Sequence, residues 1–225
     1  MSGKQGAGNK IVLVGDSGVG KTCLISRFIT GNFDANVNTT NGASYASKTV
    51  EFPQFKKSLV LDIWDTAGQE KYRSLTKFFY KDALMVIMVY DITRRESYDN
   101  VKNYWYKEIQ ENGEKNVVFG IAGNKSDLYE EEAVPEKEAR EFAQSVNAIF
   151  ALTSAQNNSG VNQLFEDMGS RFLDPNFQQK VQNEKKQVEK EQTPSNKIVL
   201  DKKDNAGKAD GGKKKKGGFC YQYYL

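Results

Sequence analysis

The fold is decided by eight consecutive residues, Gly15-Asp16-Ser17-Gly18-Val19-Gly20-Lys21-Thr22. An apolar run at residues 11–14 precedes them, and a helical pattern at residues 23–28 follows. A strand, a glycine-rich loop, a Lys-Thr pair and a helix, in this order, form the context of a phosphate-binding loop. The glycines let main-chain N–H groups turn toward a polyphosphate, and the positive end of the helix faces the same anion. The stretch therefore predicts a phosphate site at the end of the first strand.

The last two residues of this stretch have separate chemical tasks. Lys21 is expected to reach the β- and γ-phosphates, and the Thr22 hydroxyl is a hard oxygen ligand suited to Mg²⁺. We predict nucleotide contacts from Gly15, Ser17, Gly18, Val19, Gly20, Lys21, Thr22 and Cys23. The alternative is a strand-to-helix turn that is glycine-rich without binding phosphate.

Length and composition exclude several classes of protein. The chain has 225 residues, of which 38% are hydrophobic, so we expect one sizeable core and a polar tail. It contains no histidine, which excludes a Ser-His or Cys-His nucleophile pair. Two cysteines, Cys23 and Cys220, make a disulfide framework or a zinc site improbable, and the cytosol is the expected compartment. The polar first ten residues do not resemble a secretory signal, and no apolar run approaches the roughly 18–20 residues of a membrane span.

Charge is distributed unevenly along the chain. The last 50 residues hold 12 of the 32 basic residues but only 6 of the 29 acidic ones. Residues 1–175 are therefore slightly acidic, with 20 basic and 23 acidic side chains. An acidic core is a poor nucleic-acid binder, so no nucleic-acid partner is expected, and the basic character belongs to the tail.

Apolar runs alternate with helical patterns along the first three quarters of the chain. The runs predict strands near residues 10–14, 43–52, 58–65, 83–91, 117–123 and 148–152. The helical patterns lie near residues 21–30, 69–78, 96–112, 135–146 and 160–171. Strands two and three are joined through the short segment Pro53-Gln54-Phe55-Lys56 and should form an antiparallel hairpin. The continuous apolar runs of strands four and five are typical of buried parallel strands. The fold class is α/β: a doubly wound, mostly parallel six-stranded sheet with five helices.

Composition also divides the chain into three parts. Residues 1–7 are expected to be a flexible N-terminus, and residues 8–174 a single, monomeric nucleotide-binding domain. From residue 175 onward, Lys, Glu, Gln, Asn and Gly replace the apolar residues, so residues 175–225 are expected to form a disordered tail.

Two later segments indicate which nucleotide binds. Asn124-Lys125-Ser126-Asp127 follows the fifth strand. An ionised Asp127 can accept N–H bonds from the guanine N1 and N2 positions, and adenine offers no such pair of donors. Lys125 can lie over the ring, and Asn124 can tie this loop to the phosphate loop. At the end of the sixth strand, Ser154 and Ala155 could supply a main-chain N–H to the guanine O6, with Gln156 beside them.

The hydrolytic segment is Asp65-Thr66-Ala67-Gly68-Gln69-Glu70. Asp65 ends the third strand and is expected to hold Mg²⁺ through a water. The Gly68 N–H could meet the γ-phosphate. Gln69 would orient the attacking water, which suits the loose transition state of phosphoryl transfer because an amide positions better than it abstracts protons.

With these motifs, residues 8–174 resemble the Ras-like small GTPases, and the Rab branch in particular. Ile63-Trp64, residues 71–76, residues 79–83 and Val89-Tyr90-Asp91-Ile92-Thr93 look like Rab signature segments. The resemblance implies that Phe33 packs on the guanine edge and that Thr40 ligates Mg²⁺ and touches the γ-phosphate. It also implies an effector surface of Tyr45, Trp64 and Phe79, although core packing is the alternative role for Trp64. The segment at residues 41–44, Asp62 and Gln156 depart from the usual Rab pattern. Asn41 is polar where effectors of the family usually meet an apolar side chain, which leaves partner choice open, whereas the main-chain contact from Ala155 is unaffected by Gln156.

The resemblance further implies a switch controlled by other proteins. GTP and Mg²⁺ would order two loops, and hydrolysis would release them. No arginine stands out that would stabilise the transition state, so a GTPase-activating protein, an exchange factor, effectors and an escort of the GDI type are expected partners. Near its end the tail carries four lysines at residues 213–216 and Cys220, a candidate for prenylation or palmitoylation. These features suit the cytoplasmic face of an intracellular membrane, endosomal or of another vesicle. The Cys220 position does not fit the C-a-a-X pattern, and an unmodified tail is the alternative.

Two other functions compete with the switch. The first is a guanine-nucleotide-binding scaffold that does not hydrolyse GTP, and the presence of Gln69, Thr40 and Asp65 argues against it. A kinase of small substrates would need an arginine-bearing lid and an acceptor site, for which the sequence gives no sign. A Ras-like switch that is not attached to a membrane also remains open.

Overall fold

The computed structural model describes residues 8–35, 40, 43–66 and 80–179. Six strands form one sheet in the order β2-β3-β1-β4-β5-β6. Only the β2–β3 pair is antiparallel, and all the other neighbours are parallel. The strands span Asn9–Val14 (β1), Ala43–Phe52 (β2), Lys57–Thr66 (β3), Met85–Asp91 (β4), Val118–Asn124 (β5) and Ile149–Thr153 (β6). The predicted six-stranded α/β sheet is confirmed, with each strand within two residues of its expected ends.

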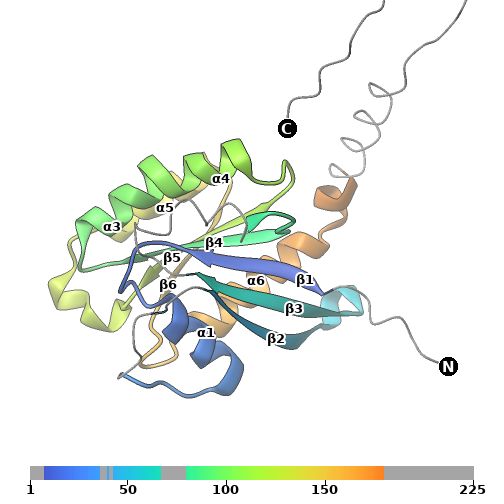
Figure 1. The fold of residues 1–225 in the computed structure, drawn as a ribbon, viewed down its shortest axis with the longest axis horizontal. Helices are drawn as coiled ribbons and strands as arrows, with labels where there is room; N and C mark the ends of the chain where they lie inside the picture. Colours follow the sequence, from blue (N-terminus) through green and yellow to red (C-terminus); the bar gives the residue numbers. More distant parts are fainter. Residues whose placement is uncertain (1–7, 36–39, 41–42, 67–79, 180–225) are drawn as a thin grey trace, which may run out of the picture.

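The helices cover both faces of this sheet (Figure 1). Alternate residues of β1 and β4 join two separate apolar cores, one beneath α1 and α6 and the other beneath α3, α4 and α5. Ile11 and Leu13 belong to the first core, whereas Val12 and Val14 belong to the second. All seven residues of β4 are buried, which explains its uninterrupted apolar sequence. The helices are α1 (Lys21–Thr30), α3 (Arg95–Asn100), α4 (Tyr106–Asn112), α5 (Glu136–Ser145) and α6 (Val161–Leu173).

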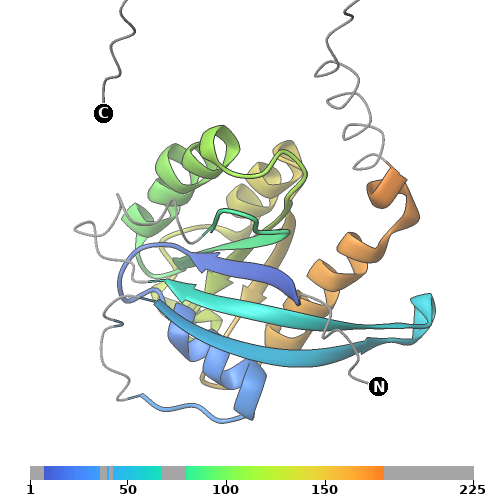
Figure 2. The same cartoon turned by 45° about the vertical axis from the view of Figure 1, so that its right-hand side comes forward.

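The hairpin of β2 and β3 extends beyond the rest of the sheet (Figure 2). A short 3₁₀ turn at Pro53–Phe55 joins the two strands, and Lys56 closes it in the left-handed conformation. The predicted helix at residues 69–78 lies outside the described residues.

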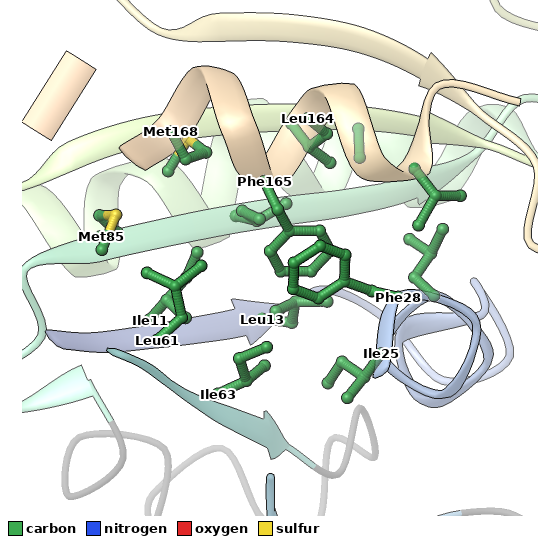
Figure 3. Packing of buried hydrophobic residues seen from close by; sticks show 14 of the residues in the cluster. Ile11, Leu13, Ile25, Phe28, Leu61, Ile63, Met85, Leu164, Phe165 and Met168 are labelled. Carbon is green, nitrogen blue, oxygen red and sulfur yellow. The ribbon is translucent and has the colours of Figure 1, made fainter. Parts of the chain in front are cut away.

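The first core is held together by aromatic side chains from two helices (Figure 3). Phe28 of α1 and Phe165 of α6 stack with their ring centroids 3.9 Å apart. Below them lie Ile11 and Leu13 of β1, and each of these side chains is fully buried. Because α1 is packed this tightly, the phosphate loop that precedes it rests on a rigid base.

The sequence predicts one helix at residues 96–112, but the helical segment at residues 95–112 contains an irregular turn. Residues Val101–Trp105 form a π-helix between α3 and α4, and the N–H of Tyr106 bonds to the Val101 carbonyl. A turn of this kind is rare and contains hydrogen bonds from residue i+5 to residue i.

The structure describes only the beginning of the expected tail. Residues 175–179 are helical, Gln178 N–H donates to the Asp174 carbonyl at 3.0 Å, and Phe177 packs against the first core. The remainder of the tail, with Cys220, lies outside the described residues. None of the helices in the described part of the chain combines the length and hydrophobicity that a membrane span requires.

Candidate functional site

The loop between β1 and α1 has the backbone shape of a phosphate cradle. Gly15, Gly18 and Gly20 have φ angles of 141°, 75° and 94°. A Cβ on Gly15 would lie 2.2 Å from the Val89 carbonyl oxygen, and one on Gly20 would lie 2.3 Å from Asn124 Nδ2. Glycine is therefore required at both positions, by conformation and by close approach.

Lys21 lies inside this loop. Its Nζ donates to the Gly15 carbonyl at 2.8 Å and to the Asp16 carbonyl at 2.9 Å. The side chain is buried, and this burial lowers the Lys21 pKa to about 8, although the nearby Asp65 and Asp16 act in the opposite direction. Within the part of the chain that the structure describes, the Lys21 ammonium bonds to main-chain oxygens of its own loop, so it is well placed to bind an anion entering that loop.

Three oxygen-bearing side chains from distant parts of the sequence meet beside Lys21. Thr22 Oγ1 donates to Asp65 Oδ2 at 2.6 Å and lies 2.7 Å from Thr40 Oγ1. Thr40 Oγ1 lies 3.2 Å from the same carboxylate oxygen. The other oxygen, Asp65 Oδ1, is buried and has no hydrogen-bond partner among the described residues. Burial raises the pKa of Asp65, with the two threonine hydroxyls and Lys21 opposing the shift.

This oxygen cluster fits a hard divalent cation. An unpaired buried carboxylate oxygen is costly, and two hydroxyls plus one carboxylate are ligands that Mg²⁺ accepts when phosphate oxygens and waters complete its shell. The described residues contain no group of three or more His, Cys, Asp or Glu side chains that could hold a metal by themselves. A cation here would therefore bind together with phosphate.

The other end of the site is built by the segment after β5. Asn124 Nδ2 donates to the Val19 carbonyl at 2.8 Å, so the predicted tie to the phosphate loop is present. Lys125 has a left-handed backbone, with φ 65°, and its Nζ lies 2.5 Å from Asp91 Oδ2. This ion pair fixes the Lys125 side chain along the pocket wall.

Asp91 supports Lys125 from the end of β4 and is itself buried. Burial by itself raises the Asp91 pKa, but the hydrogen bonds from Lys125 and Thr93 outweigh it, and the pKa lies below its ordinary value. Asp91 is therefore ionised at neutral pH and fixes the position of the lysine.

The loop after β6 closes this end. Asp127 accepts a hydrogen bond from the Ser154 hydroxyl. Arg27 Nε donates to the Ala155 carbonyl at 2.6 Å, and Arg27 Nη2 donates to the Gln156 carbonyl at 2.7 Å. The same guanidinium lies over the Phe33 ring, with 5.9 Å from Cζ to the ring centroid. Arg27 thus joins α1, Phe33 and the loop after β6 around one opening.

These groups line one pocket with a volume of about 320 Å³. Most of the predicted site residues lie on its wall: Ser17, Gly18, Gly20, Lys21, Thr22, Cys23, Phe33, Thr40, Asn124, Lys125, Asp127, Ala155 and Gln156. Gly15, Val19 and Ser154 do not line it; they are buried behind it, and Asp65 is reached through Thr22 and Thr40. Gly68, Gln69 and Phe79 lie outside the described residues.

Several residues of the site were not identified from the sequence. Ala35, Thr66 and Leu128 also line the pocket. Asp91 and Arg27 act from behind its wall, and Arg94 Nη2 donates to the Ser17 carbonyl at 2.8 Å. For Asp91, the sequence held one signal of a role in the site: it ends a buried strand at the same sheet edge as Asn124. Arg27 and Arg94 gave none, since their partners are main-chain atoms 77 to 129 residues away.

The predicted effector surface is partly described. Tyr45 is 55% exposed, and its ring meets the half-buried Trp64 edge-on with centroids 5.5 Å apart. Tyr45 Oη donates to Asp62 Oδ1 at 2.7 Å, and Lys10 Nζ lies 5.1 Å from the Trp64 ring centroid. The two aromatic side chains therefore form a continuous patch on β2 and β3.

Comparison with known proteins agrees with this geometry. The Ras family model matches residues 10–174. Human Ras-related protein Rab-22A is 42% identical over 163 residues, which cover 72% of this chain and 82% of the relative. Human Ras-related protein Rab-31 is 41% identical over 168 residues, 74% of this chain and 85% of the relative. Ras-related protein RABA4b of Arabidopsis thaliana is 39% identical over 167 residues, 74% and 73% of the two chains. The chain thus belongs to the Ras family, in its Rab branch, and is a small GTPase switch of membrane traffic that binds guanine nucleotide and hydrolyses GTP.

Proposed function

We propose that this GTPase works with Mg²⁺, held by Thr22, Thr40 and Asp65 together with the β- and γ-phosphates. The observation that carries the proposal is the convergence of these three oxygen-bearing side chains beside Lys21, with Asp65 Oδ1 left unpaired. When bound, Mg²⁺ supplies positive charge to the phosphate oxygens. Lys21 adds its own charge to the β- and γ-phosphates once its ammonium leaves the carbonyls of Gly15 and Asp16.

The remaining residues of the proposed site either bind the guanine ring or act on the γ-phosphate and the water that attacks it. Asp127 accepts from the guanine N1 and N2 positions, Lys125 covers the ring, and the loop at Ser154, Ala155 and Gln156 meets O6. Gln69 orients the water that attacks the γ-phosphorus, and the Gly68 N–H holds the γ-phosphate. No arginine is among the described residues that line the pocket, and Arg94 nearby is bonded to the Ser17 carbonyl. Without an arginine to stabilise the transition state, intrinsic hydrolysis should be slow, on the order of 10⁻⁴–10⁻³ per second.

Single-turnover hydrolysis tests these assignments. Wild-type protein loaded with GTP should release phosphate in Mg²⁺ and stop when the metal is chelated. Gln69→Leu should retain GTP and GDP affinity but lose most of the hydrolysis rate, whereas Thr22→Ala should weaken nucleotide binding in Mg²⁺. Equal hydrolysis by wild type and Gln69→Leu would instead indicate a scaffold that does not turn over.

The regulators and the membrane follow from the same proposal. Slow hydrolysis requires a GTPase-activating protein, tight GDP binding requires an exchange factor, and the Tyr45–Trp64 patch would contact effectors. The domain at residues 8–174 would be tethered by the tail at residues 175–225, through its lysines and a lipid on Cys220, to an intracellular membrane of endosomal type, with a GDI-type escort in the cytosol. A single lipid binds membranes only marginally, so the lysines must contribute.

Two measurements test the tether. Mass spectrometry of the native C-terminal peptide shows whether Cys220 carries a prenyl or palmitoyl group. Co-sedimentation with vesicles containing phosphatidylserine should fall when the four lysines at residues 213–216 are replaced by serine, and should fall with added salt. Salt-independent binding, or an unmodified Cys220 with no binding, would mean a switch that is not attached to a membrane.

A further inference from the structure

The phosphate loop is held from outside by a part of the chain that does not touch the pocket. Asn100 Nδ2 donates to Asp16 Oδ2 at 2.7 Å, and Trp105 Nε1 donates to Asp16 Oδ1 at 3.1 Å. Each oxygen of one carboxylate thus has its own donor. Asp16 is the second residue of the phosphate loop, and its carbonyl already accepts from Lys21.

Both donors come from the two ends of the π turn. In a regular α-helix, with 3.6 residues per turn, residues five apart point about 140° away from each other. In the π turn, the residue at i+5 lies over residue i, as the bond from the Tyr106 N–H to the Val101 carbonyl shows. Asn100 and Trp105 are five apart, so the π turn is what lets both reach the same carboxylate.

The anchor of this arrangement is rigid. Trp105 is 1% exposed in the second core, and Tyr104 meets its ring edge-on with centroids 4.9 Å apart. Arg94, just before α3, adds a contact to the next residue of the loop through the Ser17 carbonyl. Residues of this helical segment therefore hydrogen-bond to two successive residues of the phosphate loop, Asp16 and Ser17.

We propose that Asn100 and Trp105 are positioning residues for nucleotide binding, which hold the phosphate loop in its binding shape through Asp16. The π turn at residues 101–105 is the device that brings them together. This proposal rests on the proposed nucleotide site. It also implies that a partner that changed the conformation of the π turn from its exposed side would weaken nucleotide binding.

The test measures the dissociation rate of a fluorescent GDP analogue in Mg²⁺ from the full-length chain. Asp16→Ala, Asn100→Ala and Trp105→Phe should each raise this rate at least about fivefold. Asn100→Ala and Trp105→Phe each remove one hydrogen bond to the Asp16 carboxylate, and Asp16→Ala removes both. Trp105→Phe keeps an aromatic ring in the core but loses the N–H donor. The matched control is Asn103→Ala, which changes an exposed residue of the same type in the same turn.

A double-mutant cycle distinguishes positioning from general packing. If Asn100 and Trp105 act through Asp16, neither Asn100→Ala nor Trp105→Phe should raise the rate further in an Asp16→Ala background. Fully additive effects, or rates within twofold of wild type for all three single variants, would overturn the proposal.

A spectroscopic readout completes the test. The chain has two tryptophans, so Trp105 is the only one in a Trp64→Phe background. Its emission should change when GDP is added, and Asp16→Asn should remove that change; an identical response in both proteins would contradict the link. A wild-type chain that binds no guanine nucleotide in this assay would overturn the proposed function itself, which is a different outcome.

Discussion

Asp127 is held by the Ser154 hydroxyl at the base end of the pocket, with its carboxylate facing the space a purine would fill. Asn in its place offers one acceptor and one N–H₂ donor, which match the N1–H and the C2 carbonyl of xanthine. The Asn amide cannot accept from both N–H groups of guanine, so one of them is left unpaired. We therefore expect Asp127→Asn to lose at least about 100-fold in GDP affinity and to gain affinity for xanthosine diphosphate. Competition binding with both nucleotides measures this. Glu130→Gln, at an exposed neighbour, is the control, and unchanged GDP affinity in Asp127→Asn would rule out the assigned role.

Asp91 allows a prediction on pH. Its pKa is lowered in the folded protein, so its contribution to stability is present above the unfolded-state pKa and is lost as pH falls through the folded value. We expect Asp91→Asn to unfold more easily by about 1–3 kcal/mol at pH 7, because Lys125 and Thr93 lose a charged partner. Urea unfolding at pH 7 and at pH 3.5 should show the difference from wild type shrinking at the lower pH. A difference that is constant with pH would mean that the charge of Asp91 contributes nothing.

At the scale of elements, the sequence predicted the strands well and the irregular turns poorly. The strands were predictable because burial on two faces leaves an uninterrupted apolar run, as in β4, and burial on one face leaves alternation, as in β3. The π turn was not, because one extra residue per turn hardly alters an apolar pattern over eighteen residues. The pocket wall was predictable where motifs are local. Contacts such as Arg27 with Ala155 were not, since they depend on how α1 packs against the loop after β6.

Helix α6 offers a test of how closely it packs on the sheet. A Cβ on Gly169 would lie 2.2 Å from the tip of the Phe52 ring, which is itself 1% exposed. Alanine favours the helix by about 1 kcal/mol over glycine, but overpacking typically costs about 1–3 kcal/mol. We expect Gly169→Ala to lower the free energy of unfolding and Phe52→Leu to relieve part of that loss in the double variant. Thermal unfolding measures both, with exposed Asn162→Ala as control; a more stable Gly169→Ala single variant would show that Phe52 moves freely.

At the scale of the whole molecule, the site joins segments that are otherwise independent. The carboxyl ends of β1, β3, β4 and β5 meet at one edge of the sheet. Lys21 and Asn124 line the pocket there, and Asp65 and Asp91 support its wall through Thr22 and Lys125. A nucleotide in this pocket depends on all four segments, so it binds only the folded chain. Binding should therefore stabilise the entire domain and not a single loop.

This coupling gives the last prediction. With GDP at about 100 times its dissociation constant, the folded state gains about 2.7 kcal/mol, which corresponds to a rise in Tm of about 5–10 °C for a domain of this size. Part of the rise should vanish when Mg²⁺ is chelated, and Asp65→Asn should lose that metal-dependent part, because the carboxylate shared by Thr22 and Thr40 is then neutral. ATP at the same concentration is the control and should leave Tm unchanged. A metal-dependent rise that survives in Asp65→Asn would place the cation elsewhere, since Asp65 is the carboxylate within hydrogen-bonding distance of both threonine hydroxyls.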